Sequence, residues 1–154
     1  MTSLAVDLAN QPYLAGLSPE YIELLAGCAT HVIWSAGETI CTEGGSANSF
    51  FLIYHGKVAI EVDVPGPGVV TIETLDAGDV LGWSWLFPPY RWHFDVRAME
   101  LTRMIEINAS CLRAKIEEDH EFGFEMMRRF AQTIIERLQS TRLQLLDMYG
   151  QVDG

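Results

Sequence analysis

Residues 49–82 read SFFLIYHGKVAIEVDVPGPGVVTIETLDAGDVLG, a series of β-rich runs divided by glycines. Within it, VDVPGPGVVTI is typical of a hairpin with its tip at residues 65–68, because proline in a tip gives up no ladder hydrogen bond and glycine there can adopt positive φ. Similar runs continue on both sides, from His31 to about Asn108. Together they are HVIWSA, ETICT, SFFLIYH, KVAIEVDV, VVTIETL, DVLGW, FDVRAM and TRMIEI. Short strands at this spacing predict an antiparallel sandwich or roll.

Helical signals flank the predicted strands. Ser18 can cap a short helix that has Pro19 at its first position and Gly27 near its end. The chain becomes helical again from about Ser110. We therefore expect a roll over residues 30–109 between a short N-terminal helix and C-terminal helices at about 110–149.

The last helical segment carries an apolar stripe at alternating steps of three and four, typical of a coiled-coil seam. Its members are Phe124, Met127, Ala131, Ile134, Leu138, Thr141, Leu145 and Met148. A helix of about 40 Å is longer than a small roll can cover. We therefore predict a homodimer through this stripe, and the alternative is a helix that packs within a monomer.

Length and charge limit the possible functions. The 154 residues fit one domain, 1–154. The net charge of −11, from 10 basic and 21 acidic residues, argues against direct binding of nucleic acid or of an anionic membrane, since both need a basic surface. No apolar run approaches the ~20 residues of a membrane span, and the N-terminus lacks the basic region of a signal peptide. These features predict a cytoplasmic protein.

The reactive side chains form no recognisable cluster. Cys28, Cys41 and Cys111 are odd in number and far apart, so we expect reduced, buried thiols in a cytosol, without a disulfide framework, which also favours a cytoplasmic location. An iron–sulfur cluster would need four thiolates. The histidines show no HxH or HxxxH spacing, so we expect no metal. We find no catalytic motif and expect neither enzymatic activity nor a cofactor.

The ordered motifs resemble the cyclic-nucleotide-binding domain of the Crp–Fnr regulator family. They are GETI at 37–40, EGG at 43–45, SFFLIYHGKV at 49–58, LDAGDVLG at 75–82 and VRA at 96–98. The resemblance implies a mainly β fold: an eight-stranded antiparallel β-roll (a double-stranded β-helix, or jelly roll) with a short N-terminal helix and a long C-terminal dimerisation helix. Arg97 lies within the shared strand text, so we expect its role to be structural.

In that family a cassette holds the ligand phosphate. It reads Gly-Glu-x-small-Leu and, a few residues later, Arg-Ser/Thr-Ala. Backbone N–H groups bind the anion, the arginine pairs with it and the glutamate accepts from the ribose hydroxyl. Here Gly82 and Leu86 match, but Trp83 and Trp85 stand at the glutamate and small positions. Counting back from VRA places Trp92 where the arginine belongs. The resemblance therefore implies weak or no binding of cyclic AMP.

Two interpretations of the altered cassette remain open. The indoles either fill the pocket as core or reshape it for a flat, apolar ligand with one acidic group, which Arg91 would hold. Arg91 could instead be a surface arginine paired with Asp95 or Glu100, and His93 a structural histidine. The candidate ligand-binding residues are Gly82, Trp83, Ser84, Trp85, Leu86, Arg91, Trp92 and His93.

Three functions follow from these interpretations. The leading hypothesis is a stand-alone, non-catalytic sensor domain that binds a small molecule in the roll and signals through the dimer helix. The first alternative is an interaction module with a filled, ligand-free pocket that recruits a partner protein. The second is a transcription regulator. In the resembled family a helix-turn-helix domain follows the long helix, and because this sequence stops at Gly154, DNA readout is expected to need another chain.

Overall fold

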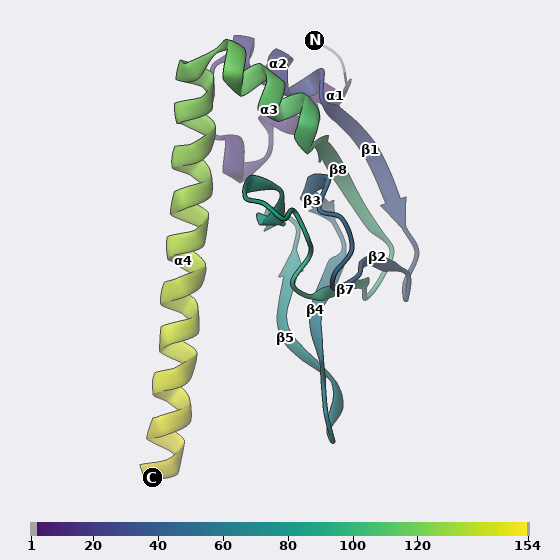
Figure 1. Cartoon of the computed structure of the whole chain (residues 1–154), viewed down its shortest axis with the longest axis vertical. Coiled ribbons are helices and arrows are strands. Elements are labelled where there is room, and N and C mark those ends of the chain that lie inside the picture. The colour runs from purple at the N-terminus through teal and green to yellow at the C-terminus, as the bar shows by residue number, and fades with distance from the viewer. Residues whose placement is uncertain (1–2, 154) are drawn as a thin grey trace.

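The computed structural model describes residues 3–153, with side chains as far as Met148. Eight antiparallel strands form two four-stranded sheets, in the orders β1-β8-β3-β6 and β2-β7-β4-β5 (Figure 1). The strands are β1 (Ala29–Trp34), β2 (Thr39–Cys41), β3 (Ser49–His55), β4 (Lys57–Val64), β5 (Gly68–Asp76), β6 (Val80–Leu81), β7 (Asp95–Ala98) and β8 (Thr102–Asn108). The predicted β-roll is confirmed.

The β4–β5 hairpin has its tip where the sequence predicted it. Val64 pairs with Gly68 at the end of the ladder. Gly66 and Gly68 have φ values of 95° and 85°, a region that side chains with a Cβ enter only with strain. The glycines of PGPG therefore allow the chain to reverse tightly at this point.

The predicted N-terminal helix is α2 (Pro19–Ala26). The Ser18 hydroxyl accepts a hydrogen bond from the Tyr21 amide at 3.3 Å, and Gly27 is the C-cap. The sequence analysis missed α1 (Ser3–Ala9) and the 3-10 turn η1 (Pro12–Leu14). Both pack against the roll through Ala5, Leu8 and Leu14. They are too short to show a helical period, so tertiary packing defines them.

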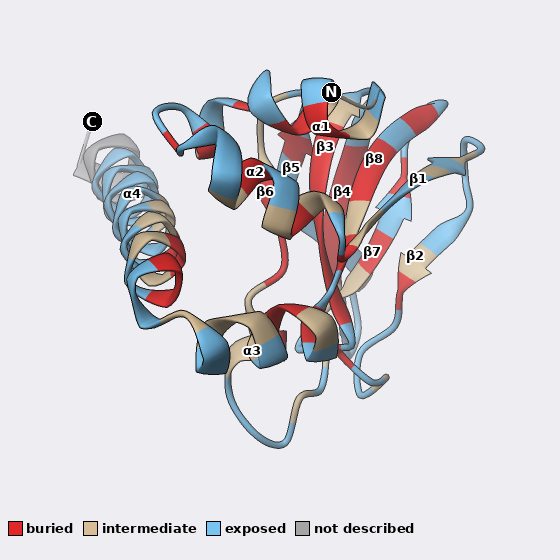
Figure 2. Ribbon diagram, turned by 90° about the horizontal axis from the view of Figure 1, so that it is seen from above, coloured by how far each residue is buried: buried red, intermediate tan, exposed pale blue. Residues whose placement is uncertain are grey.

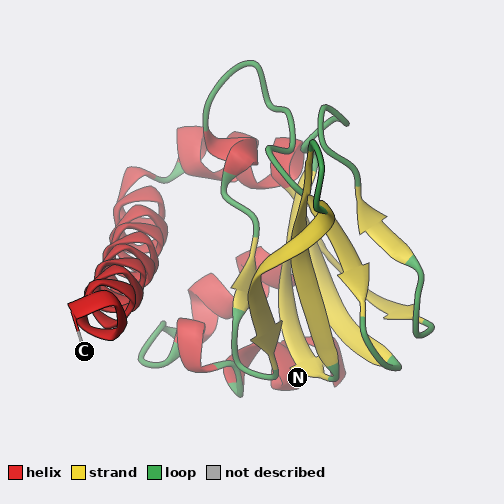
Figure 3. Cartoon of the chain, turned by 90° about the horizontal axis from the view of Figure 1, so that it is seen from below, coloured by secondary structure: helices red, strands yellow, loops and turns green. Residues whose placement is uncertain are grey.

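Two helices follow the roll. The side chain of Asn108 caps α3 (Ala109–Glu118) by accepting from the Cys111 amide at 2.8 Å. The last helix, α4 (His120–Asp153), has 34 residues, about 51 Å at 1.5 Å per residue. It runs along the length of the molecule (Figure 1) and lies to one side of the strands (Figure 3). No helix within the described residues is both long and apolar enough to cross a membrane.

Only the first third of α4 is anchored in the core. Phe122, Met126 and Phe130 are buried against the roll, and beyond Phe130 the apolar side chains of α4 are exposed. Figure 2 shows this change from buried to exposed along the helix. The distal part of α4 therefore carries apolar side chains that the described residues leave exposed.

The cysteine prediction was wrong for two of the three thiols. Cys28 and Cys111 form a disulfide across 83 residues of sequence. The β1–β8 register pairs Ala29 with Ile107, and the Asn108 amide donates to the Cys28 carbonyl at 2.9 Å. These contacts bring the start of α3 beside the end of α2, which spacing alone could not reveal. The disulfide also removes the reduced-thiol support for a cytoplasmic location, which stays a prediction.

The structural expectations for Cys41 and Arg97 hold. Cys41 is free and buried, and burial raises its pKa to about 12, so it is not a reactive thiol at neutral pH. Arg97 donates two hydrogen bonds to the Glu61 carboxylate, at 3.2 and 2.9 Å, between the neighbouring strands β7 and β4. The guanidinium holds the pKa of Glu61 below its usual value. Arg97 is thus a structural residue of this sheet.

Reduction of the Cys28–Cys111 disulfide should destabilise the fold, because the bond limits the conformational freedom of the unfolded chain over a long loop. We expect the free energy of unfolding in urea to fall by ~2–4 kcal/mol on reduction. The Cys28→Ala/Cys111→Ala variant should match the reduced protein and should not respond to further reductant. Equal unfolding midpoints for the oxidised and reduced protein would show that the bond contributes no stability.

Candidate functional site

The cassette segment leaves β6 at Gly82 and returns to the sheet at β7. Gly82 has a φ of +102°, and a Cβ built on it would lie 2.7 Å from the Trp92 ring. Glycine is therefore needed at this position for two reasons, its backbone conformation and the close approach of an indole. Trp92, which the sequence placed at the phosphate-arginine position, lies against the backbone of the cassette glycine.

Trp85 belongs to the core. It sits in the 3-10 turn η2 (Ser84–Leu86) and is 1% exposed. Its ring stacks on Phe50 at 5.2 Å between centroids and meets Phe130 of α4 edge-on at 5.0 Å. Leu86 packs against the same cluster. Trp85 therefore agrees with the interpretation in which the indoles fill the pocket as part of the core.

A small cavity remains under the cassette. Its volume is about 30 Å³, close to the share of one water in the liquid, whereas ligand pockets usually measure about 300–1,000 Å³. Five of the eight predicted ligand residues line it. The full lining is Ile60, Leu81, Gly82, Trp83, Ser84, Trp92, His93, Phe94, Val96 and Arg137. In this conformation the cassette has no room for a nucleotide.

Arg91 lies outside this cavity. Its Nη1 donates to the Gly44 carbonyl and to the Ser46 hydroxyl, both at 3.3 Å, and it contacts neither of the carboxylates proposed for it. The reason is a β-bridge between Ser46 and Arg91, which lays the side chain along the loop before β3. The side chain is exposed and has no contact with the cassette interior.

The cation that does line the cavity is Arg137 of α4, which the sequence analysis missed. Its side chain is 16% exposed. It donates a hydrogen bond to the Val80 carbonyl, and its guanidinium carbon lies 5.0 Å above the centre of the Trp83 ring. Glu73 is 3.9 Å away. Burial lowers the pKa of Arg137. The only hint in the sequence was its place three residues after Ile134, beside the apolar stripe.

Most of the predicted dimer residues are exposed in the single chain. Phe124, Ile134, Leu138, Leu145 and Met148 have 40–65% of their surface exposed. Ala131 and Thr141 are also exposed, whereas Met127 is half-buried against the core. The stripe is therefore available to a partner along almost its whole length, while dimerisation itself stays a prediction.

Comparison with known proteins agrees with this geometry. The model of the family described as "Cyclic nucleotide-binding domain" matches residues 31–119. A solved structure of a cyclic nucleotide-binding protein from Geobacter metallireducens is 25% identical, with a TM-score of 0.78 over 90% of this chain and 99% of that chain. The catabolite activator protein of Thermus thermophilus has a TM-score of 0.72 at 21% identity, over 90% of this chain and 63% of that chain.

The chain is also similar to one part of a much longer curated protein. Glutaminase 1 of Bradyrhizobium diazoefficiens is 27% identical over 143 residues, which is 86% of this chain and 21% of that protein. The chain thus spans about a fifth of the length of this relative. The family match covers more than half of the chain, and the architecture is that of Crp–Fnr-type regulators, a fold used for regulatory ligand binding. The chain belongs to the cyclic nucleotide-binding domain family.

Proposed function

We propose that this chain is a non-catalytic regulatory module that dimerises through α4, and that its cassette is filled by its own side chains and does not bind cyclic nucleotides. The observation that carries the proposal is the cavity of about 30 Å³ beneath Trp92. The ribose acceptor is replaced by Trp83, and Arg91 is bonded to a neighbouring loop. The module would thus act through its surface, by recruiting a partner protein, as in the first alternative above.

The α4 stripe supports the dimer part of the proposal. Exposed apolar side chains that follow a heptad pattern are stabilised when a second helix covers them. Phe122, Met126 and Phe130 already fix the start of α4 to the roll, so a partner helix on the distal part would dock on an element with a defined direction. A second copy of the chain offers the same stripe and can satisfy both helices.

Calorimetry with cyclic AMP and cyclic GMP tests the filled cassette. Each missing charge-assisted contact costs ~1.5–3 kcal/mol, and two are missing here. We therefore expect a dissociation constant weaker than about 1 mM for both nucleotides. A low-micromolar constant would mean that Trp92 moves out of the cassette on binding and would overturn this part of the proposal.

The contact between Gly82 and Trp92 can be tested by a double-mutant cycle. Gly82→Ala should lower the free energy of unfolding by about 1–3 kcal/mol, because the new Cβ is strained at positive φ and collides with the indole. In Trp92→Ala the same glycine substitution should cost less, since the collision is gone. Gly66→Ala is the matched control, because it also has positive φ but open space around it. Additive effects at residues 82 and 92 would contradict the contact.

Dimerisation is tested by light scattering at micromolar concentration. We expect the unmodified protein to be a dimer, and Ile134→Glu/Leu138→Glu to raise its dissociation constant at least a hundredfold, or about 2.8 kcal/mol, because like charges would meet at the seam. Gln139→Glu, an exposed position outside the stripe, should leave the dimer intact. A monomeric wild type would rule out this part of the proposal.

A further inference from the structure

The disulfide lies where the end of α2 and the start of α3 meet. Cys28 directly follows Gly27, the C-cap of α2, and Cys111 is in the first turn of α3. The two cysteines differ in burial, because Cys28 is 6% exposed and packs in the core cluster, whereas Cys111 is only half-buried. The Cys111 Sγ lies 3.9 Å from the carbonyl oxygen of Gly27, which is itself exposed. A small thiol from the solvent would therefore reach Cys111 first.

Two features of α3 would stabilise a thiolate at Cys111. The helix has ten residues and Cys111 is the third of them, so its sulfur lies at the end where the peptide dipoles leave a positive partial charge. Lys115 follows one turn later, and a Cβ built on Gly27 would lie 3.7 Å from its Nζ. Because Gly27 also contacts the Cys111 sulfur, the Lys115 ammonium lies close to the disulfide. Thiols at helix N-termini and beside lysines ionise more readily than a free cysteine.

The charges around the disulfide leave Lys115 available. Within the described residues, Lys115 forms no ion pair. Glu106 of β8, the strand before α3, accepts a hydrogen bond from the Ser49 hydroxyl at 2.9 Å. The acidic residues of α2, of α3 and of the first turn of α4 are all exposed, so water and salt screen their charge. They are Glu20, Glu23, Glu117, Glu118 and Glu121. Lys115 therefore keeps its charge for a thiolate at Cys111.

The other two cysteines differ from Cys111 in their surroundings. When reduced, Cys28 would be a neutral thiol, because it packs among apolar side chains and burial disfavours a thiolate. Cys41 belongs to the separate cluster inside the roll, and burial raises its pKa to about 12, so it is too weakly ionised to exchange. An accessible thiolate beside a second, resolving cysteine is the arrangement of redox-sensing sites.

We propose that Cys28–Cys111 is a redox-active disulfide that exchanges with glutathione or a similar small thiol, with Cys111 as the reactive cysteine and Cys28 as the resolving one. In reduction, a glutathione thiolate attacks the Cys111 Sγ, the bond between the cysteines breaks, and Cys28 leaves and takes up a proton. A second glutathione attacks the glutathione sulfur of the mixed disulfide and releases the Cys111 thiolate and oxidised glutathione. Two electrons thus pass from two glutathione thiols to the protein. The site shares no residue with the cassette or the α4 stripe, so it goes beyond the proposed function.

The unmodified protein tests the site in glutathione buffers without denaturant. After acid quenching and alkylation, mass spectrometry reports the fraction of the Cys28–Cys111 pair that is reduced. At the ratio of thiol to disulfide found in a cytosol, we expect at least half of the protein to be reduced, because the Cys111 thiolate stabilises the reduced form. A smaller reduced fraction at this ratio would show a purely structural disulfide and would overturn the proposal.

Variants then identify the reactive cysteine. Cys28→Ala and Cys111→Ala lose the same bond, but Cys28→Ala should form a mixed disulfide with oxidised glutathione at least tenfold faster at neutral pH. Its rate should be half-maximal below pH ~8.5, the ordinary value for a thiol. Adding Lys115→Gln should raise this midpoint, whereas Lys57→Gln, at the other lysine of the chain, should not. Equal rates for the two cysteine variants, or a midpoint that Lys115→Gln leaves unchanged, would refute the assignment of Cys111. The glutathione titration needs no variant, so it decides the proposal even where a variant does not fold.

Discussion

The structure depends on a contact among three aromatic rings that joins its three parts. Phe50 of β3, Trp85 of the cassette turn and Phe130 of α4 meet at centroid distances of 5.0–5.2 Å, and all three are buried. Aromatic pairs in such arrangements contribute ~0.5–1.5 kcal/mol each beyond the apolar area that they bury. The Trp85 Nε1 has no hydrogen-bond partner, an unfavourable contribution that this packing offsets. Because the rings hold the cassette turn and α4 together, a change in either element is felt by the other.

This contact also explains how the chain can belong to a nucleotide-binding family without space for a nucleotide. In the family pattern, a small residue stands where Trp85 is. Here a large ring points into the core instead, and Trp92 lies on Gly82 from the other side. The cassette backbone is thereby supported from within by side chains. In this conformation the Trp92 ring lies against Gly82, and the cavity beside it measures only about 30 Å³.

The sequence predicted the architecture well because its signals are local. Alternating strand runs, the Ser18 cap and the glycines of the 65–68 tip depend on neighbouring residues, and all appear in the structure. The site was predicted less well because it depends on residues far apart. Motif counting selected Arg91 from the cassette loop, but the strand register turned its side chain outward. Cys28 and Cys111 meet only because β1 pairs with β8.

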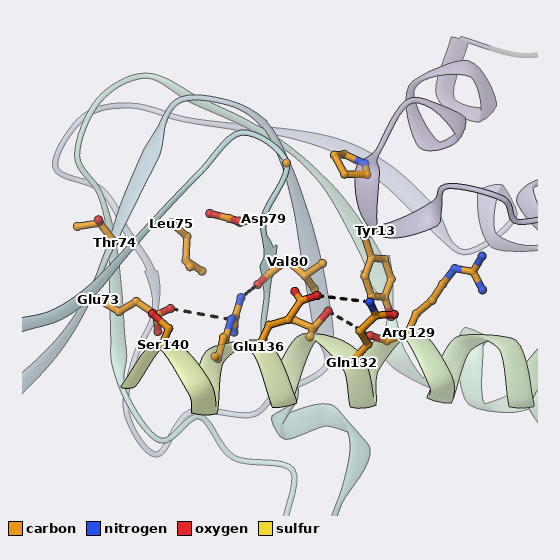
Figure 4. Close-up of a pocket in the computed structure, with 14 residues that line it drawn as sticks. Tyr13, Glu73, Thr74, Leu75, Asp79, Val80, Arg129, Gln132, Glu136 and Ser140 are labelled. Carbon is orange, nitrogen blue, oxygen red and sulfur yellow. Dashed lines mark hydrogen bonds and ion pairs between the residues drawn. The ribbon is translucent and has the colours of Figure 1, made fainter. Parts of the chain in front are cut away.

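Arg137 is a further residue whose contacts could not be predicted from the sequence, and these contacts affect how α4 is held against the roll. The helical pattern could place it next to the apolar stripe, but not above Trp83, because that contact depends on the direction in which Phe130 fixes α4. Beyond Phe130 this guanidinium reaches the roll, where it hydrogen-bonds Val80 (Figure 4) and lies over the Trp83 indole. A guanidinium exchanges partners more readily than a packed apolar side chain, since anions compete for its donors. The helix α4 is thus fixed at its start by packed aromatic side chains and further along by an exchangeable polar contact, in the part of the helix where the apolar stripe is exposed.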